Sequence, residues 1–281
     1  MASLNTSIEW TDATWNVVRG CSLVSSGCSS CYAMKSAHRF SGKGKAYEGL
    51  TELGPQGPRW TGTIRLVPEA LEEPLHWKTP RRIFVNSMSD LFHEDIPASY
   101  IVRVFEVMMA CPQHEFQILT KRPERIEPVL YGPEGGFYLG GGDWLPNVLI
   151  GFSAEDQDTF NRRWQTFERR KGEQCSWAYA MRLWCSAEPL LGPINAMRAL
   201  YNEYVRISWL VIGGESGPRA RPCDLAWIRS IKAQCQAAGV PVFYKQGGYS
   251  NRCKHDQKGG HFECFPSDLK IREYPDAIQR S

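Results

Sequence analysis

The sequence predicts an α/β fold: a partial or full parallel (β/α) barrel over residues 1–248, followed by a C-terminal extension of residues 249–281 packed on it. The chain of 281 residues has room for one such barrel, since single barrels commonly occupy about 200 to 250 residues. Short apolar runs alternate along the chain with segments of helical spacing. Polar residues follow nearly every apolar run, where a barrel carries its functional site.

Six apolar runs are typical of buried parallel strands, because they are nearly continuous and rich in β-branched and aromatic residues. An earlier strand is expected around residues 8–18, and residues 61–66 form an extra strand or an arm. The six runs are RRIFVNS (81–87), EFQILTK (115–121), NVLIGFS (147–153), MRLWCSA (181–187), ISWLVIGG (207–214) and VPVFYKQ (240–246).

Segments with helical spacing lie between several of these runs. Alternating strands and helices indicate parallel strands joined by crossover helices. The expected helices cover residues 97–110, 156–170, 196–205 and 223–239.

Composition points to a soluble protein of the reducing cytoplasm. No apolar run approaches the roughly 18 residues that span a bilayer, and the first residues lack the pattern of a secretory signal. The ten cysteines are therefore expected to be thiols or metal ligands. A formal charge of +3 permits an acidic partner without requiring one.

Three basic clusters are either solvated faces or phosphate contacts. They are Lys78, Arg81 and Arg82; Lys121, Arg122 and Arg125; and Arg162, Arg163, Arg169, Arg170 and Lys171.

Polar residues follow the six apolar runs at their C-terminal ends. In a βα barrel these ends share one face, so a common pocket is expected, although an open doubly wound sheet would also place them on one edge. The residues are Ser87, Ser89 and Asp90; Thr120, Lys121 and Arg122; Ser153 and Glu155; Ser186 and Glu188; Gly214, Glu215 and Ser216; and Lys245 and Gln246.

Cys21, Cys28 and Cys31 form a C-x6-C-x2-C motif directly after the first expected strand. Soft thiolates at short spacing suit iron-sulfur or zinc binding. Three thiolates would leave one iron of a [4Fe-4S] cluster open to the amino group and carboxylate of S-adenosylmethionine (SAM), and electron transfer into the sulfonium would release a 5′-deoxyadenosyl radical. The alternatives are no metal, or a zinc site completed by Cys253, His255, His261 or Cys264.

The other cysteines have apolar or helical contexts that favour packing roles. Cys185 is the exception, because it precedes Ser186 at a strand end. The extension carries C-x-H-x5-H-x2-C, and three interpretations stay open for it: structural packing, a lid over the pocket, or a zinc site. The cysteines in apolar or helical contexts are Cys111, Cys175, Cys185, Cys223 and Cys235.

Several stretches resemble a family of phage and mobile-element proteins with a three-cysteine motif. That family is similar to radical SAM enzymes, particularly spore photoproduct lyase, and to phage enzymes that rearrange amino acid adducts on thymidine in DNA. Here six residues separate the first two cysteines, and the aromatic Tyr32 follows the last. The stretches are TWNVVRGCSLVSSGCSSCYA, RRIFVNSMSDLFHEDIP, FQILTKRPERI, GFSAEDQ, CSAEPLLGPI, WLVIGGESGPRARP and VPVFYKQGG.

The resemblance implies a [4Fe-4S] cluster on the three cysteines and SAM bound at the strand ends. Ser87, Ser89 and Asp90 would bind the SAM amino group, with a helix N-cap as the alternative for Asp90. A structural salt bridge is the alternative for Glu188. The residues expected to bind the ribose hydroxyls and methionine carboxylate are Ser153, Glu155, Ser186 and Glu188.

The expected function is a radical SAM isomerase acting on an amino acid-modified thymidine, as DNA or nucleoside. A lyase for DNA lesions and a non-enzymatic zinc module are the alternatives. The expected partners are an electron donor such as flavodoxin and a protein from the same operon, in the host cytoplasm if a phage encodes the chain. Lys121, Tyr244 and Cys185 are the catalytic candidates. The substrate-binding candidates are Arg122, Glu215, Ser216, Arg219, Arg221, Lys245 and Gln246.

Overall fold

The computed structural model describes residues 4, 6–55, 57–133, 144–168, 181–217, 220–248, 251, 253–256 and 259–275. The chain divides into two compact units, Met1–Ile150 and Gly151–Ser281. The division falls inside strand β8 (Val148–Ser153), so each unit is described by itself. No helix in the described ranges is long and apolar enough to cross a membrane.

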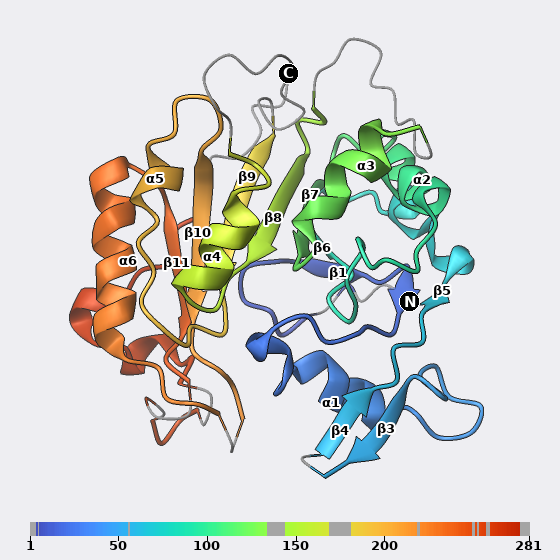
Figure 1. Ribbon diagram of the computed structural model, residues 1–281, viewed down its shortest axis with the longest axis horizontal. Helices are drawn as coiled ribbons and strands as arrows, with labels where there is room; N and C mark the ends of the chain where they lie inside the picture. Colours follow the sequence, from blue (N-terminus) through green and yellow to red (C-terminus); the bar gives the residue numbers. More distant parts are fainter. Residues whose placement is uncertain are drawn as a thin grey trace. The chain divides into compact units, whose positions relative to one another are not determined.

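The expected α/β class and parallel sheet are confirmed (Figure 1). Seven strands have the order β1-β6-β7-β8-β9-β10-β11, which follows the chain as consecutive βα units require. The pairings β1–β6, β6–β7, β9–β10 and β10–β11 are all parallel. The strands other than β8 are β1 (Ala13–Trp15), β6 (Arg82–Val85), β7 (Glu115–Thr120), β9 (Arg182–Ala187), β10 (Ile207–Gly213) and β11 (Val242–Gln246).

In the first unit, strands β1, β6 and β7 are accompanied by the helices α2 (Ala98–Met109) and α3 (Ile126–Tyr131). Helix α2 buries Ile101, Val104, Phe105 and Met108, which recur at the three- and four-residue spacing of one helix face. The expected extra strand at residues 61–66 is present as the short β5. The remaining elements of this unit are β2 (Val18–Arg19), α1 (Tyr32–Arg39), β3 (Thr51–Gly54), β4 (Gly57–Trp60) and β5 (Arg65–Leu66).

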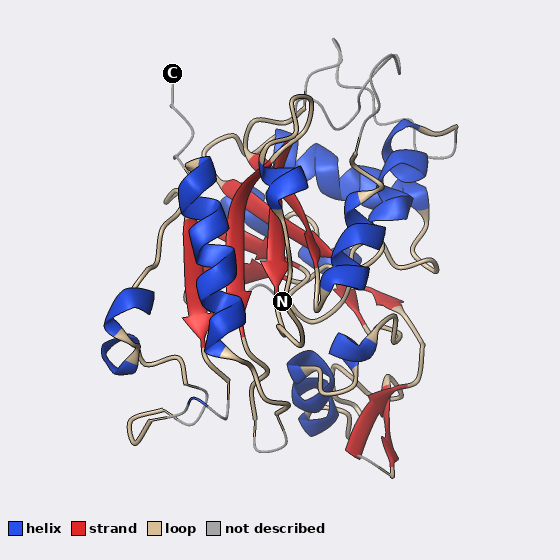
Figure 2. Ribbon diagram, turned by 60° about the vertical axis from the view of Figure 1, so that its left-hand side comes forward, coloured by secondary structure: helices blue, strands red, loops and turns tan. Residues whose placement is uncertain are grey.

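In the second unit, α6 (Leu225–Ala238) packs beside β10 and β11 (Figure 2). Its Ile228, Ile231 and Cys235 are buried. Within the strands, the rings of Trp184 and Trp209 stack with centroids 5.2 Å apart. Strand β10 pairs in parallel with both β9 and β11, and its register with β11 shifts between Ile212 and Gly213, at its C-terminal end.

Two helices are shorter than the sequence predicts. The helix expected at 156–170 is α4 (Gln157–Trp164), and the one expected at 196–205 is α5 (Met197–Leu200). After α4 the backbone tightens, since Phe167 N bonds to Trp164 O. After α5 the Asn202 side chain accepts hydrogen bonds from the amides of Tyr204 and Val205. Such a local turn competes with a further helical turn.

The described part of the C-terminal extension lies along β11. Tyr244 N donates to Ile271 O at 3.0 Å, and Trp209 Nε1 donates to Glu273 O at 3.0 Å. The Arg272 guanidinium lies over the rings of Phe243, Phe262 and Phe265. The extension therefore covers apolar surface of the second unit.

Candidate functional site

The cysteine loop of the first unit begins at Gly20, whose φ is +93°. A Cβ there would lie 2.1 Å from Thr63 O, so only glycine fits. Cys28 ends a short 3-10 turn, and Cys31 N-caps α1. Cys21 and Cys31 are half-buried and pack against a small apolar cluster: Ala33, Met34, Ala37, Leu50 and Trp60.

Burial holds two of these cysteines in the protonated form. It raises the pKa of Cys21 to about 12, and the Asp90 carboxylate adds to the effect. Burial also raises the pKa of Cys31, against the backbone amides of Met34 and Ala33, which favour its thiolate. Because metals bind thiolates, loading this loop must release protons.

The three sulfurs are not all within the 4.8 Å that would suit ligands of a single ion; among the described residues only Cys253, His261 and Cys264 meet that limit. The thiolates of an iron-sulfur cluster bind different irons, so they lie farther apart than the ligands of one ion. Three thiols in this loop could hold a cluster, or a single ion after side-chain rotation.

Asp90 is buried beside this loop, and four donors surround its carboxylate. Thr120 Oγ1 donates at 2.7 Å, the amides of Phe92 and Lys121 donate at 3.0 Å, and Arg122 Nη1 donates at 3.1 Å. The amide of Phe92 is the local cap that the sequence offered as the alternative. The other three donors tie the residues that follow β6 to the end of β7.

The Arg122 side chain contacts both the Asp90 carboxylate and Ser22 of the cysteine loop. Its Nε donates to Glu94 Oε2 at 2.6 Å, and its Nη2 donates to Ser22 Oγ at 2.6 Å. Ser22 Oγ is also 2.8 Å from Nε2 of the buried His93. Burial and the Arg122 charge lower the pKa of His93, which is therefore neutral at pH 7. The positive charge of Arg122 also acts on Cys21, where it opposes the effect of burial on the pKa of the thiol.

Ser87 and Ser89 hold two loops of the first unit together. Ser87 Oγ donates to Asn16 Oδ1 at 3.1 Å, and Ser89 Oγ donates to Val18 O at 2.9 Å. Asn86, with a φ of 56°, accepts at Oδ1 from Val17 N, while its buried Nδ2 has no hydrogen-bond partner among the described residues. A buried, unpaired amide donor is a candidate contact for a ligand oxygen.

In the second unit, the Glu188 side chain contacts residues at the ends of two strands, β9 and β11. Its Oε1 is 3.1 Å from Lys245 Nζ, and its Oε2 accepts from Ser186 Oγ at 3.2 Å. A Cβ on Gly213 would lie 2.6 Å from Glu188 Oε1. Side chains after β9 and within β11 therefore meet over a glycine of β10.

Glu155 and Arg163 form a separate, fully buried ion pair at 3.0 Å, and Arg163 also donates to Ser153 O at 2.7 Å. Burial contradicts the expectation that Arg163 belongs to a basic surface. Arg162 is exposed. Arg169, Arg170 and Lys171 lie outside the described residues.

Among the other substrate-binding candidates, Arg221 and Glu215 contact each other, and Gln246 contacts the main chain. Arg221 Nε donates to Glu215 Oε2 at 3.1 Å, and Gln246 Nε2 donates to Gly214 O at 2.7 Å. Ser216 is half-buried, and Arg219 lies outside the described residues.

Of the three catalytic candidates, two are buried. The Tyr244 ring packs 4.4 Å from the Phe265 ring, and burial raises its pKa. Cys185 is fully buried on β9, whereas Lys121 is half-buried. Among the three, only Lys121 presents side-chain surface in its unit.

Comparison with known proteins identifies a family for this chain. A family model described as "Protein of unknown function (DUF5131)" matches residues 5–265. The chain belongs to the DUF5131 family. No curated protein and no solved structure matches it.

The DUF5131 chain also uses polar residues that the sequence did not single out: Asn16, Ser22, His93 and Glu94. Asn16 directly follows β1, so the rule that polar residues at strand ends build the site would have found it. Ser22 and His93 are 71 residues apart, and no local pattern predicts their contact.

Proposed function

We propose that this DUF5131 protein is a radical SAM enzyme whose parallel sheet is part of a radical SAM-type (β/α) barrel. Cys21, Cys28 and Cys31 would hold a [4Fe-4S] cluster. The observation that carries the proposal is the cysteine loop: three free thiols follow β1 and β2, and two of them, Cys21 and Cys31, pack against the same apolar cluster.

The surroundings of the loop support an anionic cluster. The apolar side chains around α1 limit water at Cys21 and Cys31, and Arg122 supplies positive charge through Ser22. When bound with SAM, the cluster would supply a 5′-deoxyadenosyl radical.

SAM-binding roles are proposed in each unit separately. In the first, the 86–90 segment offers the Nδ2 of Asn86 and main-chain groups beside Ser87 and Ser89, while the Asp90 carboxylate positions Lys121 and Arg122. In the second, Ser186 and Glu188 are polar groups at one strand end, and Lys245 offers a cation for a carboxylate or phosphate.

The proposed reaction isomerises an amino acid-modified thymidine in DNA. One hydrogen leaves the adduct, a carbon–nitrogen bond migrates and the hydrogen returns, so the reaction is redox-neutral. A base within a duplex would first be extruded at a cost of a few kcal/mol. The resemblance to phage thymidine-modifying enzymes supports this substrate.

Anaerobic purification tests the proposal. We expect iron and sulfide in equal amounts, a brown chromophore and reductive SAM cleavage, all lost on Cys21→Ala, Cys28→Ala or Cys31→Ala. Cys111→Ala is the control, because that buried thiol lies apart from the loop in sequence. If the triple cysteine variant still bound about four irons per chain, the cluster assignment would be wrong. Bond scission instead of isomerisation would indicate a lyase.

A further inference from the structure

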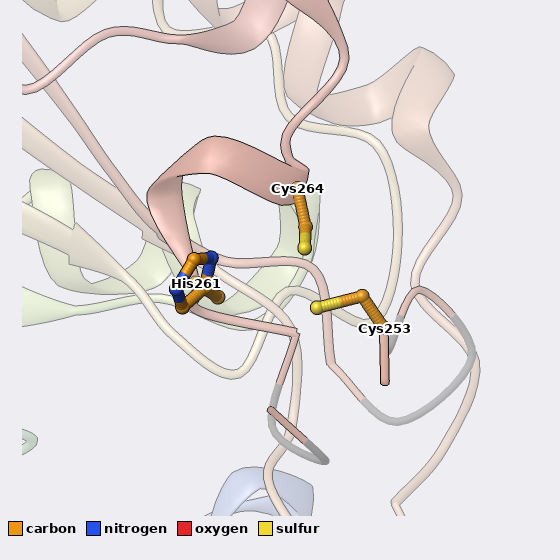
Figure 3. A group of neighbouring side chains, drawn as sticks. All are labelled: Cys253, His261 and Cys264. Carbon is orange, nitrogen blue, oxygen red and sulfur yellow. The ribbon is translucent and has the colours of Figure 1, made fainter. Parts of the chain in front are cut away.

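A second group of metal-ligand residues lies in the C-terminal extension (Figure 3). Ligand atoms of Cys253, His261 and Cys264 all lie within 4.8 Å of one another. Figure 3 shows the two sulfurs facing each other, with the His261 ring beside them. Three soft or borderline ligands at this separation suit one ion.

Two tight turns bring these ligands together. Cys253 and Asp256 exchange backbone hydrogen bonds of 3.2 Å in both directions, which fixes the first turn. His261 precedes the 3-10 turn Phe262–Cys264, and Cys264 N donates to His261 O at 2.9 Å. The second turn therefore places His261 and Cys264, which are three residues apart, on the same side of the turn.

The backbone between the ligands is anchored by hydrogen bonds to Gly247, the residue after β11, and to Arg272. Gly247 N donates to Gly259 O at 2.8 Å, and Arg272 Nη2 donates to Gly260 O at 2.9 Å. Gly260 N also donates to Asp256 Oδ2 at 2.7 Å. The site is thus preorganised, which lowers the ordering cost of binding.

We propose that Cys253, His261 and Cys264 bind a zinc ion, with His255 as the fourth ligand. Two thiolates balance the charge of Zn²⁺, and a Cys2His2 set is typical of closed, structural zinc sites. The His255 ring lies 5.2 Å from the His261 ring, so it can complete the set through a side-chain rotation. This site is separate from the cysteine loop of the proposed function.

The zinc would stabilise a segment with little core of its own. Residues 259–275 contain two short 3-10 turns, and their fully or nearly buried apolar side chains are Phe265 and Leu269. Small segments of this kind depend on crosslinks or metals for stability. The ion would hold the turn around Cys253 to the turn around Cys264, and both to β11.

Zinc analysis of the full-length protein tests the inference without measuring activity. We expect about one zinc per chain, and a zinc-edge X-ray absorption spectrum with two sulfurs at about 2.3 Å and nitrogen at about 2.0 Å. In a Cys21→Ala, Cys28→Ala, Cys31→Ala background, zinc should persist, which separates this site from the cluster.

Matched variants locate the ion. Cys253→Ser with Cys264→Ser should reduce bound zinc at least about tenfold, and His255→Gln should weaken its retention against a chelator. Lys254→Gln, between two ligands, should change neither.

Three results would overturn the proposal. They are a wild-type chain without zinc, a double variant that keeps zinc bound by two sulfurs, and a Cys253–Cys264 disulfide in protein kept with reductant. If the double variant fails to fold, cobalt exchange into wild type decides: no thiolate-to-cobalt absorption means no site.

Discussion

Arg122 joins the cysteine loop to the strand ends of the first unit. Its side chain spans the Asp90 carboxylate, Glu94 and Ser22, and it is almost fully buried with Asp90. The sequence placed Arg122 among the substrate contacts, because it follows a strand. Its ion pair joins residues 32 apart and its bond to Ser22 joins residues 100 apart, so neither could be predicted from local pattern. The cysteine motif is predicted from its spacing, its place after the first strand and the family resemblance.

Arg122→Met should destabilise the protein by about 3 kcal/mol, because it leaves the Asp90 carboxylate buried without its cation. Urea unfolding measures the loss, and adding Asp90→Asn should recover part of it. Arg229→Met is the control: it removes the exposed Arg229–Asp268 pair, which solvent screens, and should change the unfolding free energy little. Equal losses from the two single variants would contradict the assigned role of the buried pair.

Metal binding at the cysteine loop should depend steeply on pH. Since Cys21 has a pKa of about 12, it is protonated in the metal-free protein at pH 7 and must lose its proton on binding. Affinity for cobalt, used as a probe, should therefore rise with pH beyond 9 instead of levelling off near the pKa of an ordinary thiol. Titration at several pH values measures this, and Cys21→Ala should flatten the dependence. A plateau below pH 9 in wild type would argue against a buried, protonated Cys21.

At the scale of elements, strands were predicted better than helix ends. The six apolar runs each contain a strand, because burial on both faces leaves a continuous apolar signal. The hairpin of β3 and β4 and helix α1 were not predicted, since their sequences contain no continuous apolar run. Helix α5 ends where the Asn202 side chain bonds to nearby amides, a local competition that helical periodicity does not register.

Two glycines are required for different reasons, Gly239 for its backbone conformation and Gly151 for the packing of a neighbouring side chain. Gly239 ends α6 with a φ of +65° and open space around its Cα, so Gly239→Ala should cost about 1 kcal/mol through the backbone alone. Gly151 has no such φ, but a Cβ would lie 2.5 Å from Trp184 Nε1. Gly151→Ala should therefore cost more, about 1 to 3 kcal/mol, by overpacking. Urea unfolding compares the variants; the reverse order would contradict this packing.

The buried Cys235 of helix α6 should make the folded protein less stable as the pH rises above 9. Burial raises the pKa of Cys235 from 9.0 to about 12. Below pH 9 the thiol is protonated in both folded and unfolded chains; between pH 9 and 12 only the unfolded chain loses the proton. Stability should therefore fall with rising pH in that window, by about 1.4 kcal/mol per pH unit for each such thiol. Cys235→Ala should have a shallower fall of melting temperature from pH 9 to 11; identical slopes would exclude a contribution from Cys235.

At the scale of the whole molecule, membership of DUF5131 covers residues 5–265, so both units and most of the described extension belong to the family pattern. Within each unit, the candidate sites combine residues that are far apart in sequence. In the first unit, Ser87 donates a hydrogen bond to Asn16, and Arg122 donates hydrogen bonds to both Asp90 and Ser22. The strand ends that contribute to these sites follow from the positions of the apolar runs in the sequence. Which polar groups pair with each other does not follow from the sequence pattern, because pairing depends on side-chain packing.

The choice between DNA and a free nucleoside as substrate is tested by salt dependence. Phosphate contacts release counterions, so binding to modified DNA should weaken steeply as salt rises, whereas a nucleoside should show little dependence. Arg162 is exposed on α4 and Arg163 is buried against Glu155, so only the first is available to phosphate. Arg162→Gln should weaken DNA binding and flatten its salt dependence, without changing reductive SAM cleavage in the absence of DNA.

Arg163 provides the contrast for that experiment. Arg163→Gln should lower the urea midpoint, because it removes the buried cation that lies 3.0 Å from the Glu155 carboxylate, and any loss of DNA binding should follow the loss of fold. Lys121, half-buried beside the Asp90–Arg122 pair, should affect turnover but not the salt slope when replaced by alanine. Equal turnover on modified nucleoside and modified DNA, with no salt-dependent binding to the DNA, would eliminate the DNA substrate and leave a small-molecule radical SAM enzyme.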